Sequence, residues 1–226
     1  MKLYIGNRNY SSWSMRAGVL LAQAGIPHEA VVLRFDAFTA ESQFKRELAR
    51  ISPAGRVPVL IDGDLAVWDT LAIAEYVAEK FPDRALWPTD RAARARARSV
   101  CAEMHAGFTA LRGACPMNIE AWLPDAGALI WRDNAAVRAD VTRIVEMWSG
   151  LLRSSGGPLL FGEFSIADAY YAPVCMRLAT YALPVPALIG EYVERVKALP
   201  GVAAWIAAAL EERDFLDFEE PYRLKR

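Results

Sequence analysis

The sequence predicts a small α/β unit followed by an all-helical region, and three observations support this fold class. Short apolar runs that suit β-strands occur before Asp69 and largely vanish after Pro88. An Asp-Gly pair, Asp62-Gly63, separates two of these runs, which is a strong hairpin signal. After Pro88 the apolar residues recur at the spacing of one helix face.

The chain opens with a strand, a helix and a second strand. Leu3-Tyr4-Ile5 is a short apolar run that suits a strand. The following helix should start near Trp13 and end at Gly25, because glycine followed by a proline, here Pro27, is a common helix stop. Ala30–Leu33 supplies the second strand, and such a unit is expected to be parallel with a right-handed connection.

A helix, a hairpin and a further helix complete the α/β unit. Helical spacing is weak around Leu48, whereas Val57–Ile61 and Leu65–Trp68 suit two strands joined by a turn at Asp62-Gly63, whose central residues would both take positive φ. Asp69-Thr70 then opens a helix, since both residue types cap helix N-termini. The resulting order of elements is the thioredoxin-like arrangement.

The chain is expected to contain two domains. Pro82 ends the third helix, and the polar stretch after it contains a second proline, Pro88. We therefore place an α/β domain at residues 1–82, a linker at 83–90 and an all-helical domain at 91–226.

Five helical segments are predicted in the second domain. One helix should run from Arg91 to Arg112, and an apolar stripe over 137–152 predicts another. Ser165–Asp168 resembles a capping box at a helix start, with aspartate in place of the usual glutamate. Two further helices are expected at 189–199 and 202–212.

Composition and charge argue against several classes of function. A formal net charge of −1 gives no electrostatic case for binding nucleic acid or an anionic membrane. No apolar run approaches the roughly 18 residues of a membrane span, and Met1–Gly6 is too short for a signal peptide. The three cysteines and two histidines fit no metal spacing. We therefore expect a cytoplasmic protein with reduced thiols and no metal.

Three local sequences resemble signatures of the cytosolic glutathione transferases. They are Pro53–Leu60, Asp69–Tyr76 and Phe161–Ala169, and the resemblance extends through both halves of the chain. The family usually has glutamate or glutamine followed by serine where this chain has Asp69-Thr70, so the acid is shorter by one methylene. The resemblance implies a thioredoxin-like first domain, an all-helical second domain, glutathione as co-substrate and a homodimer.

Two of these motifs are the expected glutathione-binding elements. The resemblance implies a cis bond between Val57 and Pro58, whose neighbouring main-chain groups would pair with the peptide like an added strand. A helix N-terminus favours a carboxylate, so Thr70 would receive the γ-glutamyl carboxylate and Asp69 would accept from its ammonium group. Read alone, Pro58 could serve the fold only, and Asp69-Thr70 could be a plain helix cap.

The reactive centre is expected where the first strand meets the first helix. Thioredoxin-type redox proteins have Cys-x-x-Cys there, whereas this chain has no cysteine in that segment, so the protein itself cannot exchange disulfides. The run Ser-Ser-x-Ser-x-Arg resembles serine-type branches of the family, zeta-like ones especially. Ser12, or failing it Ser11, would hold the glutathione thiolate, with Tyr10 as the rival.

One hydrogen bond can account for most of the activation of glutathione. Lowering a thiol pKa from about 8.5 by two units requires roughly 2.7 kcal/mol. A hydrogen bond to a charged acceptor supplies about 1.5–3 kcal/mol, and a helix N-terminus about 0.3–1 kcal/mol more. No separate base or metal is needed.

The second substrate, a small hydrophobic electrophile, is expected between the domains. Candidate residues are Tyr10 and four on the first long helix of the second domain, namely Met104, His105, Phe108 and Arg112. The predicted function is conjugation of glutathione to this electrophile. One alternative is a glutathione-dependent cis–trans isomerase of the maleylacetoacetate type, although the cysteine that commonly follows those serines is missing. Another is a non-catalytic interaction module, against which the intact binding motifs argue.

Overall fold

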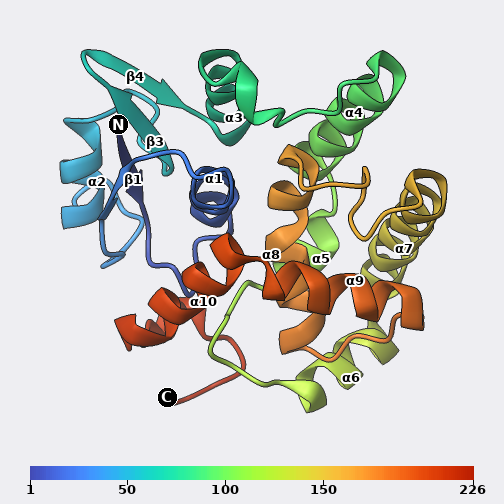
Figure 1. Ribbon diagram of the computed structural model, residues 1–226. Helices are drawn as coiled ribbons and strands as arrows, with labels where there is room; N and C mark the ends of the chain where they lie inside the picture. Colours follow the sequence, from blue (N-terminus) through green and yellow to red (C-terminus); the bar gives the residue numbers. More distant parts are fainter.

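The computed structural model describes residues 1–226, and its first part is a four-stranded sheet with helices around it (Figure 1). Strand β1 (Lys2–Ile5) pairs in parallel with β2 (Glu29–Val32) and antiparallel with β3 (Val59–Asp62), which pairs antiparallel with β4 (Leu65–Trp68). The helices of this part are α1 (Ser12–Gln23), α2 (Gln43–Ala49) and α3 (Thr70–Lys80). The α/β fold class predicted for this half is confirmed.

The hairpin turn differs by one residue from the prediction. Asp62 is the last residue of β3 and pairs with Leu65, so the two central residues are Gly63 and Asp64. Of these only Gly63 has a positive φ, 58°. Glycine at the first central position is the pattern of one common two-residue hairpin turn, which needs no positive φ at the second.

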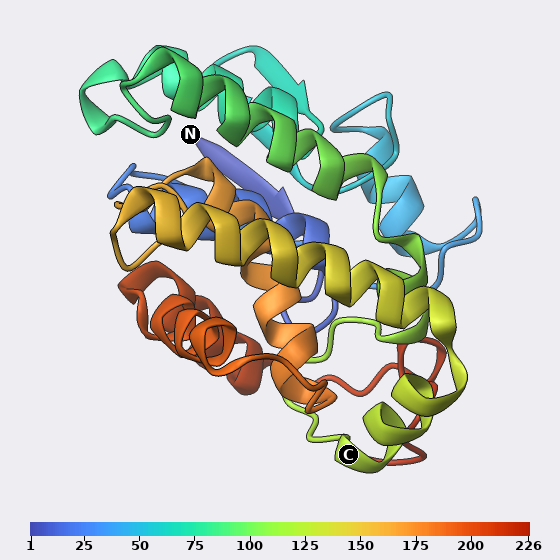
Figure 2. The same cartoon turned by 90° about the vertical axis from the view of Figure 1, so that its right-hand side faces the viewer.

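The second part is all-helical, as predicted. After a short 3-10 turn at Pro82–Arg84 it contains the following helices: α4 (Arg91–Ala106), α5 (Thr109–Ala114), α6 (Pro124–Asp133), α7 (Ala135–Ser155), α8 (Ile166–Thr180), α9 (Ala187–Ala198) and α10 (Pro200–Glu212). Figure 2 shows α4 (green) and α7 (yellow) running alongside one another. Arg143 of α7 donates two hydrogen bonds, of 2.7 and 2.9 Å, to Glu103 of α4.

The single helix predicted from Arg91 to Arg112 is wrong, because the chain turns at Gly107 and Phe108. Phe108 lies in the left-handed region at φ 55°, and α5 starts directly after it. A side chain at Gly107 would place its Cβ 2.7 Å from the Glu103 carbonyl oxygen, so this tight turn requires glycine. Arg112 therefore lies on α5, and its guanidinium donates to the carbonyl oxygens of His105 and Gly107 at the end of α4.

One large core joins the two parts of the chain. A cluster of 49 buried apolar residues includes members of β1, α1, α3, α4, α7, α8 and α10. Helix α1 packs against both α8 and α10, and a Cβ at Gly18 would lie 2.2 Å from the Trp205 ring. The predicted capping interaction at the start of α8 is present, since Asp168 accepts from the main-chain N–H and the hydroxyl of Ser165. The contacts with α8 and α10 fix the position of α1.

The C-terminal segment, residues 213–226, returns from α10 to the first part of the chain (Figure 1, red). It contains a short 3-10 turn at Asp217–Glu219. Asn7 donates to Asp214 at 2.6 Å, and the ring of Phe218 packs edge-on against Phe38 with centroids 5.4 Å apart. The segment thereby forms one wall beside the loop that precedes α1. No helix of the structure has the length and apolar character needed to cross a membrane.

Candidate active site

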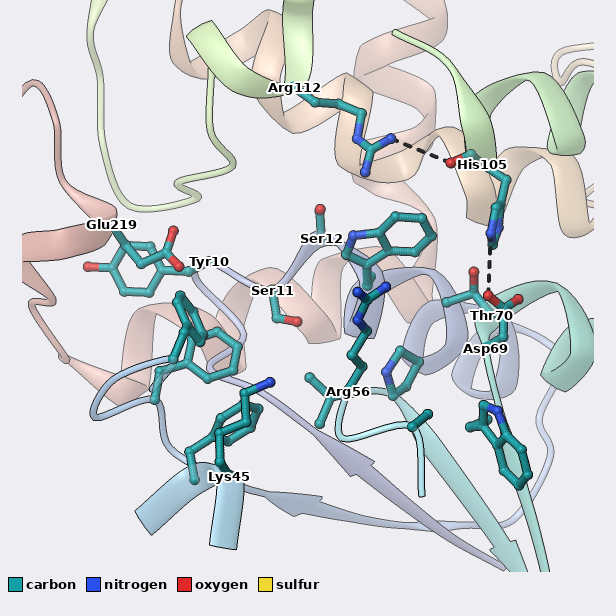
Figure 3. A pocket seen from close by; sticks show the side chains of 18 residues that line it. Tyr10, Ser11, Ser12, Lys45, Arg56, Asp69, Thr70, His105, Arg112 and Glu219 are labelled. Atoms are coloured by element: carbon teal, nitrogen blue, oxygen red, sulfur yellow. Dashed lines mark hydrogen bonds and ion pairs between the residues drawn. The ribbon is translucent and has the colours of Figure 1, made fainter. Parts of the chain in front are cut away.

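A cavity of about 720 Å³ lies between the sheet-containing part and the helical part (Figure 3). Its walls come from the loop before α1, from α2, from the approach to β3, from the β4–α3 junction, and from α4, α5 and the C-terminal segment. Nine of the predicted site residues line it: Tyr10, Ser11, Ser12, Val57, Pro58, Asp69, Thr70, His105 and Arg112.

Val57 and Pro58 line the cavity and come directly before β3. The bond between them is cis. The main-chain N–H and C=O of Val57 have no hydrogen-bond partner within the chain. They are available to an extended ligand in the way that an exposed sheet edge accepts a strand.

Asp69 caps α3 and also reaches across to the helical part. One of its carboxylate oxygens accepts from the Leu71 N–H at 2.8 Å, so the plain helix-cap role is real. The other lies 3.3 Å from Nε2 of His105, on α4 (Figure 3). Asp69 has a positive φ of 74°, a backbone conformation that costs a non-glycine residue about 1–3 kcal/mol and is typical of functional sites.

Thr70, the first residue of α3, is buried and is hydrogen-bonded to a residue of the helical part. Its hydroxyl accepts a hydrogen bond of 2.9 Å from Tyr170 of α8. The main-chain N–H of Thr70 makes no hydrogen bond within the chain, as expected in the first turn of a helix. Together with the α3 dipole, this free donor favours an anionic group at the Asp69–Thr70 corner.

Ser11 is the N-cap of α1, and its hydroxyl is already engaged. The Ser11 oxygen accepts from the Ser14 N–H, and the hydroxyl donates to the Ser14 oxygen at 2.8 Å. Ser14 in turn accepts from the Gly6 N–H at 3.0 Å. Ser11 therefore ties the loop after β1 to the first turn of α1.

Ser12 has a different environment. Its oxygen accepts a hydrogen bond of 3.4 Å from the guanidinium of Arg177, on α8, and its hydroxyl donates to no group of the chain. In Figure 3 the Ser12 hydroxyl points toward the side of Arg112, whereas the Ser11 hydroxyl points away from it. A hydroxyl that accepts from a cation and keeps its own proton free is a good donor to an anion.

Tyr10 directs its hydroxyl toward the C-terminal segment. The hydroxyl donates to Glu220 at 2.6 Å and accepts from the Leu216 N–H. Burial, followed by the hydrogen bond to Glu220, raises the pKa of Tyr10 to about 12. This phenol is therefore a poor candidate for stabilising a thiolate, although its ring lines the cavity.

A second chamber of about 380 Å³ adjoins the first and is lined by two arginines, Arg112 and Arg177. It shares Tyr10, Ser12, Trp13, Arg112 and Glu219 with the first cavity. Its other lining residues are Arg177, Thr109, Gly113, Pro116 and Met117. Neither Arg112 nor Arg177 forms an ion pair with a carboxylate. Two unpaired guanidinium groups around one chamber favour an anionic ligand.

Arg16 adds a third cation behind this chamber. It is 2% exposed, and two of its guanidinium nitrogens have no hydrogen-bond partner. Its guanidinium lies 4.2 Å from the ring centroid of Trp13, and Arg112 lies 4.9 Å from the same ring. Burial lowers the pKa of both Arg16 and Arg177 to about 10, so both remain charged at neutral pH.

Two of the predicted electrophile-site residues lie elsewhere. Met104 and Phe108 are 1% and 6% exposed and belong to the large apolar core, and neither lines a chamber. Met104 belongs to the apolar stripe of α4 that packs toward α8, and Phe108 continues this spacing just past the end of the helix.

The sequence prediction missed several residues of the site, chiefly Trp13, Arg177 and Glu219. Arg177 could have been found, because it is a lone charged residue in the otherwise uncharged stretch from Ala169 to Leu183. Glu219 gave no such signal in the polar C-terminal segment. No group of three or more His, Cys, Asp or Glu side chains is placed to hold a metal ion.

Comparisons with known proteins agree with the fold of the chain. A curated glutathione S-transferase 1 from Dianthus caryophyllus is 29% identical over 76% of this chain and 75% of its own. A maleylacetoacetate isomerase from Pseudomonas aeruginosa is 33% identical over 53% of this chain and 55% of its own. A glutathione transferase homologue from Burkholderia gl BGR1, solved with bound glutathione, superposes with a TM-score of 0.69 at 25% identity and covers 93% of this chain and 97% of its own.

Two family models match the chain, one in each half. The glutathione S-transferase N-terminal domain matches residues 10–80 and contains the Val57-Pro58 and Asp69-Thr70 elements. The glutathione S-transferase C-terminal domain matches residues 119–208 and contains Arg177. Together the two matches span well over half of the sequence, and the chain belongs to the glutathione S-transferase family.

Proposed function

We propose that this protein binds glutathione in the larger cavity, ionises its thiol and transfers the thiolate to a small electrophile. The observation that carries this proposal is that one cavity combines the free main-chain groups of Val57, the anion-favouring start of α3 and the free hydroxyl of Ser12. These three features match the three parts of the tripeptide: its peptide backbone, its γ-glutamyl carboxylate and its thiol.

Each end of glutathione would lie next to a group of the cavity that favours its charge. The Thr70 N–H would receive the γ-glutamyl carboxylate, and Asp69 would accept from the ammonium group of the same residue. Lys45 and Arg56, which line the cavity away from Asp69, would attract the glycine carboxylate (Figure 3). Val57 would pair with the cysteine backbone between them.

Ser12 is the proposed donor to the thiolate. Its proton is free, and the Arg177 guanidinium on its oxygen strengthens it as a donor. Ser11, whose hydroxyl already donates to Ser14, would hold the α1 N-terminus in place. This assignment makes the protein a serine-type, zeta-like transferase.

The electrophile is proposed to carry a carboxylate or a similar anionic group. Arg112 and Arg177 line the second chamber beside Ser12 and have no carboxylate partner within the chain. An anionic electrophile seated on them would lie next to the thiolate. Tyr10, Trp13 and His105 would form the remaining walls. Such conjugation would serve detoxification.

The two arginines of the second chamber also favour a second candidate function, that of a glutathione-dependent cis–trans isomerase acting on an unsaturated carboxylate. In that reaction the thiolate adds reversibly to the double bond, which lets the bond rotate before the thiolate leaves. The similarity to the maleylacetoacetate isomerase from Pseudomonas aeruginosa supports this candidate.

We further propose a cytoplasmic homodimer with domain boundaries at residues 1–82 and 91–226.

A binding and activity panel on the purified protein tests the proposal. We expect retention on glutathione-agarose, a calorimetric binding signal and turnover of at least one electrophile from a panel of aryl halides, enones, peroxides and unsaturated carboxylates. Product analysis separates a thioether from an isomerised substrate, and light scattering separates a 50 kDa dimer, about twice the 25.0 kDa chain, from a monomer. A folded protein that neither binds glutathione nor turns over any panel member would refute the transferase function.

A further inference from the structure

Glu219 is the one carboxylate that lines both chambers of the site. It belongs to the short 3-10 turn of the C-terminal segment. In Figure 3 it lies beside the Tyr10 ring, on the opposite side of the cavity from Asp69. Neither the binding of glutathione nor the ionisation of its thiol requires this carboxylate.

The neighbours of Glu219 hold its backbone in place without occupying its carboxylate. On one side Phe218 packs against Phe38, and on the other Glu220 accepts from Tyr10 at 2.6 Å and from Asn118 at 2.8 and 2.9 Å. The Glu219 carboxylate itself has neither a hydrogen bond nor an ion pair within the chain. A fixed backbone with a free carboxylate suits a group that acts on a ligand.

The charged and titratable groups facing Glu219 come from three directions: Arg177 on α8, Arg112 on α5, and Tyr10 and Glu220 at its base. Burial raises the pKa of Glu219 to about 7, with Arg177 opposing this effect and Glu220 adding to it. The carboxyl group therefore exchanges its proton in the range where a transferase works.

We propose that Glu219 is the proton donor that completes the addition of glutathione to a conjugated double bond, a role that rests on the proposed transferase function. The thiolate sulfur forms a bond to the β-carbon of an unsaturated carbonyl compound while the carbon–carbon π bond breaks. The electron pair moves to the α-carbon and carbonyl oxygen, and Glu219 transfers its proton to the α-carbon. The resulting carboxylate takes up the proton that the next glutathione thiol releases on ionisation, so no other reagent is consumed.

Two electrophiles separate this role from a structural one. Addition to the enone trans-4-phenyl-3-buten-2-one requires a proton, whereas substitution on 1-chloro-2,4-dinitrobenzene expels chloride and requires none. In Glu219→Gln we expect kcat for the enone to fall about a hundredfold, the scale of general acid catalysis, and kcat for the aryl chloride to change less than about threefold. Glu219→Asp, which keeps an acid, should restore part of the enone activity.

The pH dependence of the wild-type protein gives a second readout that needs no variant. As pH rises above about 7, kcat for the enone should fall because Glu219 has lost its proton, while kcat for the aryl chloride should show no such fall. This alkaline decline should be absent from Glu219→Gln. Asp217→Asn removes an exposed carboxylate of the same turn that lines neither chamber, and it should leave both activities unchanged.

Three results would overturn the assignment. Equal loss with both electrophiles in a folded Glu219→Gln protein would make the residue a binding or structural group. Unchanged enone turnover in that variant, or an alkaline decline that both electrophiles share, would show that the proton comes from elsewhere. A folded wild-type protein that neither binds glutathione nor turns over any electrophile would instead refute the proposed transferase function, so the two failures are distinguishable.

Discussion

Replacing Ser12 with alanine should raise the pKa of bound glutathione by about one to two units. The Ser12 hydroxyl is the only serine hydroxyl of the cavity whose proton no group of the chain accepts, and Arg177 donates to its oxygen at 3.4 Å. A hydrogen bond to a charged acceptor contributes about 1.5–3 kcal/mol, and each pKa unit corresponds to about 1.4 kcal/mol. The lower part of that range applies if a water molecule replaces the lost hydroxyl.

The assay is the ultraviolet absorbance of the bound thiolate as a function of pH, supported by the pH dependence of conjugation. Affinity for an S-alkyl glutathione, which has no thiol proton, should stay nearly constant in Ser12→Ala. The matched control is Ser11→Ala, which should lower stability through loss of a helix cap, by about 0.5–2 kcal/mol, with little effect on the thiol pKa. A shift in Ser11→Ala with none in Ser12→Ala would move the role to Ser11. A shift in Tyr10→Phe alone would refute the serine-type mechanism.

Three further predictions concern the groups around the thiol. Asp69→Ala should weaken glutathione binding by about 1.5–3 kcal/mol in calorimetry, whereas Asp69→Asn, which can keep the cap on Leu71, should lose affinity without the same loss of stability. Arg177→Met should raise the KM of a carboxylate-bearing electrophile about tenfold or more, and an unchanged KM would contradict the anionic-substrate proposal. The unfolding free energy should not fall in this variant, because a buried guanidinium with few partners is costly to keep. The pKa of Glu219 is raised from 4.5 to about 7, so the folded state binds more protons than the unfolded state between these pH values. The unfolding free energy of the wild type, relative to that of Glu219→Gln, should therefore fall as pH rises from 4.5 through 7. The fall should be on the order of 3 kcal/mol at most, and urea unfolding measures it.

The fold could be predicted because its signals are local. The strands at β1, β2 and β4 and the helix starting after Asp69 each depend on a few neighbouring residues. The helix break at Gly107 could not be predicted in the same way. Met104 and Phe108 continue the apolar spacing through the break, and a phenylalanine in the left-handed region has no sequence signature.

The site was predictable where it is built from adjacent residues and not where it is assembled from distant ones. Val57, Asp69 and Thr70 fall at element ends within one short stretch, so their pattern is visible in the sequence. Arg177 reaches Ser12 across 165 positions, and Tyr10 binds Glu220 across 210. Only the packing of α8 and of the C-terminal segment against α1 brings these groups together, and that packing depends on the whole core.

The buried arginines link the stability of the fold to its chemistry. Arg16 and Arg177 are 2% and 5% exposed, and nitrogens of both lack any hydrogen-bond partner. Leaving such groups unsatisfied in a core costs about 1–3 kcal/mol each or more, and a fold selected for stability alone would pair them or replace them with apolar residues. Their pKa values, lowered to about 10 by burial, still leave both charged at neutral pH. Two retained positive charges behind the α1 N-terminus stabilise any anion that forms beside Ser12, because charges interact more strongly where water is excluded. On the proposed function, that anion is the glutathione thiolate, and Arg177 together with Arg112 holds the carboxylate of the electrophile close to it.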